Sequence, residues 1–77
     1  MEIEILFFGQ LTDIVGCSSL HLKNPGNINE LKEQLFLKSP LLREAKFTIA
    51  LNNKMVINDQ SIPENSKVAF MPPFSGG

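Results

Sequence analysis

Three features of the chain carry groups that could take part in chemistry: a lone His, a lone Cys and a Gly-Gly at the carboxyl end. His21 lies in an alternating stretch with no acidic partner at a recognisable spacing, and Cys17 has no neighbouring positive residue to favour its thiolate. No carboxylate pair, metal-ligand spacing or phosphate-binding glycine loop accompanies them. The sequence therefore predicts no metal site and no catalytic side chain for an enzyme that acts alone.

The stretch VAFMPPFSGG at residues 68–77 combines a strand-like run with two prolines and two glycines. Pro72 and Pro73 lack N–H groups, so they end sheet pairing while they hold the chain extended. The tail beyond them spans at most about 14 Å, which is enough to enter a narrow cleft in another protein, and it consists of Phe74, Ser75, Gly76 and Gly77. The alternative interpretation is a plain flexible terminus.

The carboxylate of Gly77 is the group on which we expect the chemistry to depend. A carboxylate is negatively charged and resonance-stabilised, so it needs activation before a nucleophile can replace one of its oxygens. Adenylation by an ATP-using partner would supply that activation, and a sulfur nucleophile could then convert the acyl-adenylate to a thiocarboxylate. Glycines at the tip let the backbone approach the reacting groups closely.

The elements that must position this tail follow from hydrophobic periodicity. Apolar residues at helical spacing predict one amphipathic helix over 28–38, capped by Asn27, and short helical turns are expected near 11–15 and 41–45. Alternation predicts five strands, at 2–8, 18–22, 47–51, 54–57 and 67–71.

This order of elements predicts an α+β fold of the β-grasp (ubiquitin-like) type, a mixed sheet of about five strands with one main helix packed on one face. We expect the last strand to lie parallel to the first at the sheet centre. Residues 1–71 would then form the domain, and residues 72–77 an extended, flexible tail.

Composition narrows the class of protein. The 77 residues are enough for one domain, and a net charge of −1 without a basic stripe argues against nucleic acid as the main partner. No apolar run reaches the roughly 20 residues of a membrane span. The acidic start and the single Cys favour neither a secretion signal nor disulfides, so we expect a cytoplasmic protein with no membrane partner.

A second signal is the sheet face opposite the predicted helix. Alternation predicts that the core residues of the first and last strands, which face the helix, are Ile3, Ile5, Phe7, Val68 and Phe70. The opposite phase belongs to Leu6, Phe8, Met55, Ala69 and Met71. Single exposed apolar residues are common and need no function. A contiguous patch beside the start of the tail would instead predict a protein-docking surface.

Together these features resemble a known family. The segments ILFFGQ (5–10), DIVG (13–16), ALN (50–52) and VAFMPPFSGG (68–77) are similar to those of the small subunits of molybdopterin synthase, which are ubiquitin-like sulfur carriers. The resemblance covers essentially the whole chain. Its specific part is the Pro-Pro-hydrophobic-small-Gly-Gly terminus, because Gly-Gly alone also occurs in ubiquitin and in the thiamine-pathway carrier.

The resemblance implies a function and a set of partners. An adenylating activating enzyme, which holds ATP with Mg and Zn, would activate Gly77, and a sulfur-donating sulfurtransferase would supply the sulfur of a thiocarboxylate. The tail would then insert into the large catalytic subunit of a heterotetramer, where the sulfur passes to cyclic pyranopterin monophosphate in molybdenum cofactor biosynthesis. Phe8, Met55 and Met71 match the docking surface, and this chain itself would bind no cofactor.

Two other functions stay open from the sequence. One is a sulfur carrier for thiamine synthesis or tRNA thiolation, which shares the Gly-Gly end but usually lacks the residues that precede it here. The other is a β-grasp interaction module or protein modifier that carries no sulfur.

Overall fold

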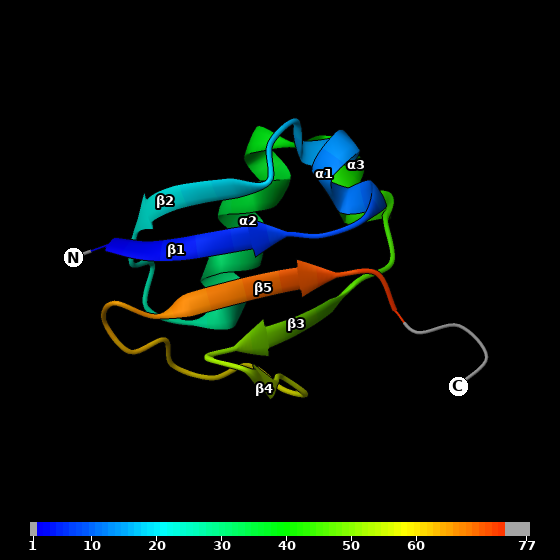
Figure 1. Cartoon of the computed structure of the whole chain (residues 1–77). Helices are drawn as coiled ribbons and strands as arrows, with labels where there is room; N and C mark the ends of the chain where they lie inside the picture. Colours follow the sequence, from blue (N-terminus) through cyan, green and yellow to red (C-terminus); the bar gives the residue numbers. More distant parts are fainter. Residues whose placement is uncertain (1, 74–77) are drawn as a thin grey trace.

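The computed structural model describes residues 2–73, and these residues form a mixed five-stranded sheet with helices packed on one face (Figure 1). The order of strands across the sheet is β2-β1-β5-β3-β4. The strands are β1 (Glu2–Phe7), β2 (Ser19–Lys23), β3 (Thr48–Leu51), β4 (Lys54–Met55) and β5 (Lys67–Met71).

The two central strands, β1 and β5, pair in parallel, with Ile5 opposite Val68 and Phe7 opposite Phe70. All the other pairings are antiparallel. The predicted placement of the last strand beside the first is therefore confirmed. Since β1 and β5 point the same way, the residues that follow each strand emerge at the same end of the sheet.

The main helix, α2 (Ile28–Lys38), begins and ends as predicted. The Asn27 side chain accepts a hydrogen bond from the Glu30 amide at 2.9 Å and so caps the first turn. Ser39 follows the helix, and Pro40 opens the short helix α3 (Pro40–Glu44), where a missing N–H costs nothing. The inward stripe of α2 is fully buried and consists of Ile28, Leu31 and Leu35.

The helix α1 (Gln10–Val15) connects β1 to β2, where the sequence predicts a short helical turn. Its Leu11 is completely buried, as is Leu42 of α3. Within residues 2–73 the predicted main helix α2 lies behind the sheet, and the two short helices α1 and α3, near the predicted helical turns, lie at one end of it (Figure 1). None of these helices has the length and hydrophobicity of a membrane-spanning segment.

The β3–β4 turn uses Asn52 and Asn53, both with positive φ (49° and 71°), as a two-residue hairpin turn requires. The predicted extent of the following strand is wrong, because β4 ends at Met55. Beyond Val56 the chain turns toward α2, where Asp59 accepts a hydrogen bond from the Asn29 amide at 2.9 Å. Ile57 is consequently 89% exposed.

The core lies between the sheet and the helices and contains the residues predicted from alternation. Phe70 is central, with ring centroids 5.6 Å from Phe7 and 5.1 Å from Phe47. Ile62, from the loop before β5, is also buried. The remaining predicted core residues of the central strands have at most 1% exposure and are Ile3, Ile5 and Val68.

Candidate functional site

The described part of the tail is its base, Pro72 and Pro73, directly after β5. Pro72 is half-buried and Pro73 is exposed. The residues predicted to reach into a partner lie outside the described residues, and these are Phe74, Ser75, Gly76 and Gly77. The structure therefore places the point from which the tail starts, and the tip remains a prediction from the sequence.

The base of the tail is held from both sides by neighbouring strands. The Phe8 amide donates to the Phe70 carbonyl at 3.1 Å, which continues the β1–β5 pairing beyond the end of β1. On the other side Thr48 pairs with Met71, and its hydroxyl donates to the Met71 carbonyl at 3.4 Å, a long and weak contact. The tail therefore starts at a fixed place at the sheet end.

An apolar row crosses the sheet face that α2 leaves uncovered. The register pairs Leu6 with Ala69, Ala69 with Ala50, and Ala50 with Met55. Phe8 and Met71 lie two residues further along from Leu6 and Ala69, and so on the same face. We call this set the apolar end of the open face, and its members are Leu6, Phe8, Ala50, Met55, Ala69 and Met71.

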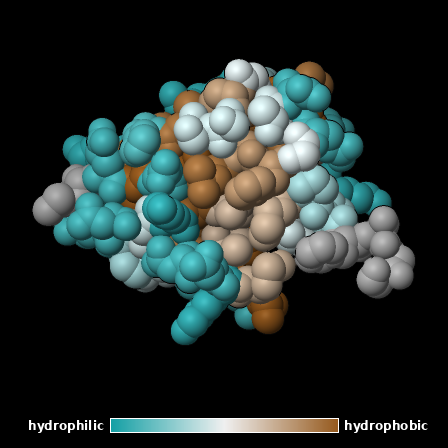
Figure 2. Space-filling view, in the orientation of Figure 1, coloured by the Kyte–Doolittle hydropathy of each residue, from teal (hydrophilic) through white to brown (hydrophobic). Residues whose placement is uncertain are grey.

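The apolar end is accessible to a partner. Phe8 is 47% exposed and Met55 is 55% exposed, while Met71 is half-buried. Figure 2 shows hydrophobic surface across the centre of this face, toward the side where β5 ends. The structure thus brings the three predicted docking residues onto one face, with Phe8 and Met71 beside the base of the tail.

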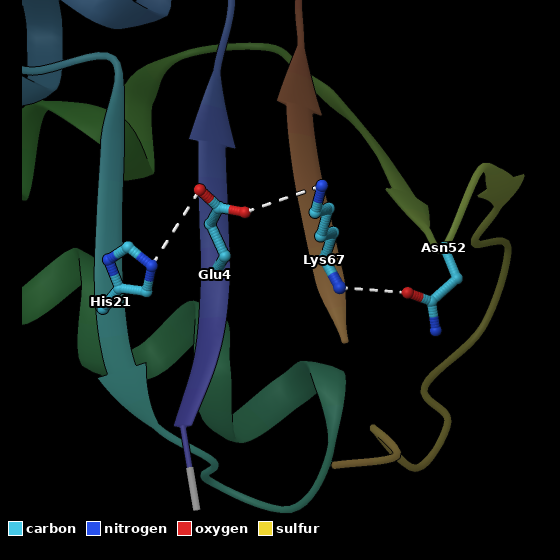
Figure 3. A network of polar contacts seen from close by, with 4 residues as sticks. All are labelled: Glu4, His21, Asn52 and Lys67. Carbon is cyan, nitrogen blue, oxygen red and sulfur yellow. Dashed lines mark hydrogen bonds and ion pairs between the residues drawn. The ribbon is translucent and has the colours of Figure 1, made fainter. Parts of the chain in front are cut away.

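The same face becomes polar toward the start of β1 and β5 (Figure 3). Glu4 lies between two basic groups, with Oε2 3.9 Å from His21 Nε2 and Oε1 3.9 Å from Lys67 Nζ. The Lys67 amide donates to Asn52 Oδ1 at 3.0 Å. We call this set the polar end of the open face, and its members are Glu4, His21, Asn52 and Lys67.

His21 has no acidic partner at a recognisable spacing in the sequence, but the fold places one beside it. Glu4 lies directly opposite His21 in the β1–β2 pairing, and only the hairpin register brings them together. The 3.9 Å separation is longer than a hydrogen bond, and the His21 side chain is 62% exposed. The pair is an exposed ion pair when the His is protonated, and this arrangement provides no catalytic dyad.

The other candidate groups do not gather into a site. Cys17 is a free, half-buried cysteine in the turn before β2. Across residues 2–73 no three side chains of His, Cys, Asp or Glu are grouped closely enough to hold a metal ion.

A groove of about 230 Å³, which was not predicted from the sequence, lies between the start of α2 and the β3–β4 edge. Its lining includes Lys32, Phe47, Met55 and Ile57. Because its walls come from separate stretches of the chain, no local pattern could have predicted it. Met55 belongs both to this groove and to the apolar end of the open face.

Comparison of the sequence with known proteins finds relatives over its full length. The ThiS family matches residues 5–77. The chain is 28% identical over 80 residues to the molybdopterin synthase sulfur carrier subunit of Escherichia coli, a match that covers 97% of this chain and 99% of that subunit. The corresponding subunit of Haemophilus influenzae is 24% identical with the same coverage.

Solved structures share the fold. A protein described as subunit 1 of a molybdopterin converting factor from Pyrococcus furiosus superposes with a TM-score of 0.84 at 16% identity, covering 96% of this chain and 99% of that one. The small archaeal modifier protein 1 of Methanosarcina acetivorans gives 0.81 at 18% identity, with 99% and 96% covered. The predicted β-grasp fold is thereby confirmed.

One further similar structure contains two proteins. It is a complex of subunits 1 and 2 of the molybdopterin-converting factor from Helicobacter pylori, and a chain in it matches with a TM-score of 0.75 and 25% identity over 100% of both chains.

Proposed function

The chain belongs to the ThiS family, and from this membership we propose that it works as the sulfur carrier subunit of a molybdopterin synthase. The observation that carries the proposal is the match to the sulfur carrier subunit of Escherichia coli, which extends over 97% of this chain and 99% of that subunit. The apolar end of the open face, beside the base of the tail, supports it.

The proposed chemistry takes place at Gly77. Its carboxylate attacks the α-phosphorus of ATP on an adenylating activating enzyme, and pyrophosphate leaves. The outer sulfur of a sulfurtransferase persulfide then attacks the acyl carbon and displaces AMP, which forms an acyl disulfide. A second thiol attacks the inner sulfur of that disulfide, so that the thiocarboxylate leaves and a disulfide forms between the two thiols. ATP, Mg and Zn belong to the activating enzyme in this scheme, and this chain contributes the acyl group and the surface that presents it.

The proposed acceptor is cyclic pyranopterin monophosphate, bound by a large catalytic subunit. The two-protein structure from Helicobacter pylori supports a large partner subunit for this chain. We propose that residues 1–71 dock through Phe8, Met55 and Met71, and that residues 72–77 extend into the active site of that subunit. Apolar contacts then hold the complex, while the reacting group stays outside the folded core.

Intact mass spectrometry tests the first half of the scheme. The purified chain is incubated with an activating enzyme, ATP, Mg²⁺ and a sulfur source. The expected result is the exchange of one oxygen for one sulfur, located at Gly77 by fragmentation. A chain that forms the adenylate and then joins to lysines of other proteins would instead be a protein modifier, and a chain that never reacts would be an interaction module.

A second experiment tests whether the carboxylate position matters and which pathway is served. One residue is added after Gly77, and the variant is compared with the wild-type chain in cells that lack a molybdopterin synthase small subunit. We expect the extended chain to fold normally and to restore no molybdenum cofactor. Complementation of a thiamine or tRNA thiolation defect, without restored molybdenum cofactor, would assign the chain to one of those pathways.

A further inference from the structure

Gly9 and Pro72, which come from opposite ends of the chain, are in direct contact at the base of the tail. Gly9 has a φ of 59°, and a Cβ atom built on it would lie 2.8 Å from Pro72 Cγ and 3.4 Å from Pro72 Cδ. Outside their own residue and its two chain neighbours, real Cβ atoms essentially never come within 3.0 Å of a heavy atom. The ring of Pro72 therefore occupies the space that a side chain at position 9 would need.

The backbone around Gly9 is itself fixed. The Thr12 amide donates to the Gly9 carbonyl at 3.1 Å, and the Leu11 amide donates to the Phe8 carbonyl at 3.2 Å. Leu11 is completely buried, so α1 is anchored in the core. A side chain introduced at Gly9 thus meets Pro72 from a support that cannot easily retreat, and Pro72 is the partner that must move.

The backbone at this contact, from Met71 to Pro73, is stiff. Proline fixes its own φ near −65° and restricts the residue before it, so Met71, Pro72 and Pro73 have few alternative backbone conformations. A displacement of the Pro72 ring is therefore passed on to Pro73, from which the tail continues.

We infer that Gly9 is a positioning residue for the proposed sulfur transfer. It leaves room for Pro72 and so sets the point and direction from which residues 74–77 start toward a partner's active site. The inference rests on the proposed function, since it concerns the delivery of Gly77. Gly9 acts through Pro72 and touches no reacting group.

The primary test is Gly9→Ala, with Gly16→Ala as its matched control. Both glycines have positive φ, 59° and 94°, so both substitutions strain the backbone, but a Cβ at Gly16 meets nothing within 4 Å. The measurements are kcat for sulfur transfer from the thiocarboxylate form and the dissociation constant for the large subunit. Thermal unfolding of each variant accompanies them.

We expect Gly9→Ala to lower kcat about tenfold or more with docking affinity unchanged, because a misplacement of about 1 Å can cost roughly a hundredfold in rate. Gly16→Ala should change kcat by less than about twofold, since its new Cβ atom has no neighbour within 4 Å to displace. Pro72→Ala removes the ring without straining Gly9 and should also lower kcat with docking unchanged. It tests the same contact even where Gly9→Ala folds poorly.

The Gly9→Ala/Pro72→Ala double variant measures how far the effect of Gly9→Ala on kcat depends on the Pro72 ring. With the ring absent, the new Cβ has nothing to displace, so Gly9→Ala in the Pro72→Ala background should cost less than about twofold in kcat. An equal loss in both backgrounds, or an equal loss in Gly16→Ala, overturns the inference. If the wild-type chain gains sulfur normally and Gly9→Ala leaves kcat unchanged, the inference about Gly9 is wrong and the proposed function stands. If the wild-type chain gains no sulfur, both the proposed function and the inference are wrong.

Discussion

The two faces of the central strands differ although their residues alternate along the same backbone. On the covered face Phe70 is completely buried between Phe7 and Phe47. On the open face its neighbour Met71 is half-buried and reaches the surface beside the base of the tail. One step along the chain thus separates a residue that stabilises the fold from one that we assign to docking.

This comparison shows why a carrier can present apolar surface without losing stability. Period-two alternation places every second side chain in the core, and the intervening side chains lie on the open face. The open face is then available for a partner, with an apolar end at the tail base and a polar end away from it (Figures 2 and 3). If the division is right, substitutions should affect either stability or docking according to the face.

The largest expected effect is on the covered face. Phe70→Ala should lower the free energy of unfolding by about 3–5 kcal/mol, because it removes a fully buried ring and leaves a cavity. That loss is comparable with the roughly 4–12 kcal/mol expected for a chain of this length. Urea denaturation followed by circular dichroism measures it.

A gentler variant covers the case in which Phe70→Ala does not fold. Phe70→Leu should cost less than about 1.5 kcal/mol, since most of the volume is retained. A loss below about 1 kcal/mol for Phe70→Ala would contradict the assignment of this face to stability.

The next effect is on docking. Met71→Asp or Phe8→Asp should weaken binding to the large subunit by about 2 kcal/mol or more, roughly thirtyfold, because a carboxylate would be buried in an apolar contact. Stability should change by less than about 1 kcal/mol. Leu41→Asp is the control, since Leu41 is 68% exposed on α3, away from the open face. Equal affinities for all three variants in calorimetry would remove the docking role.

A smaller effect concerns the helix that covers the sheet. Asn27→Ala removes the cap that accepts from the Glu30 amide, and it should cost about 1 kcal/mol of stability without altering docking. Asn29→Ala is the matched control, because Asn29 is exposed in the same turn and should change stability by less than about 0.5 kcal/mol. Equal losses for the two variants would show that the cap contributes nothing.

How far the sequence predicts this molecule depends on the range of each interaction. Local signals succeeded: alternation sorted Phe70 and Met71 onto opposite faces, and Asn27 marked the start of α2 at the expected residue. Contacts between segments far apart in the sequence could not be predicted from it. The partner of His21 is set by hairpin register, and the contact of Asp59 with the start of α2 joins residues 30 positions apart.

The same limit applies to the candidate site. The docking residues were predicted because each carries the phase of the open face, which is a local property. The packing of Pro72 on Gly9 needed the parallel β1–β5 pairing to bring both strand ends together, and no spacing in the sequence encodes it.

The smallest expected effect is at the polar end of the open face, and it tests whether that end shares the docking role. Glu4→Gln removes two contacts of 3.9 Å, to His21 and Lys67, whose side chains are 62% and 70% exposed. Exposed pairs of this kind contribute about 0–1 kcal/mol, so stability should change by less than about 1 kcal/mol.

A rim charge acts mainly on the association rate, and we expect Glu4→Gln to change that rate and its salt dependence while the dissociation rate stays constant. Stopped-flow binding at two salt concentrations measures both. A rise in the dissociation rate as large as that of Met71→Asp would mean that the docking surface covers the whole open face and that the division between its two ends is wrong.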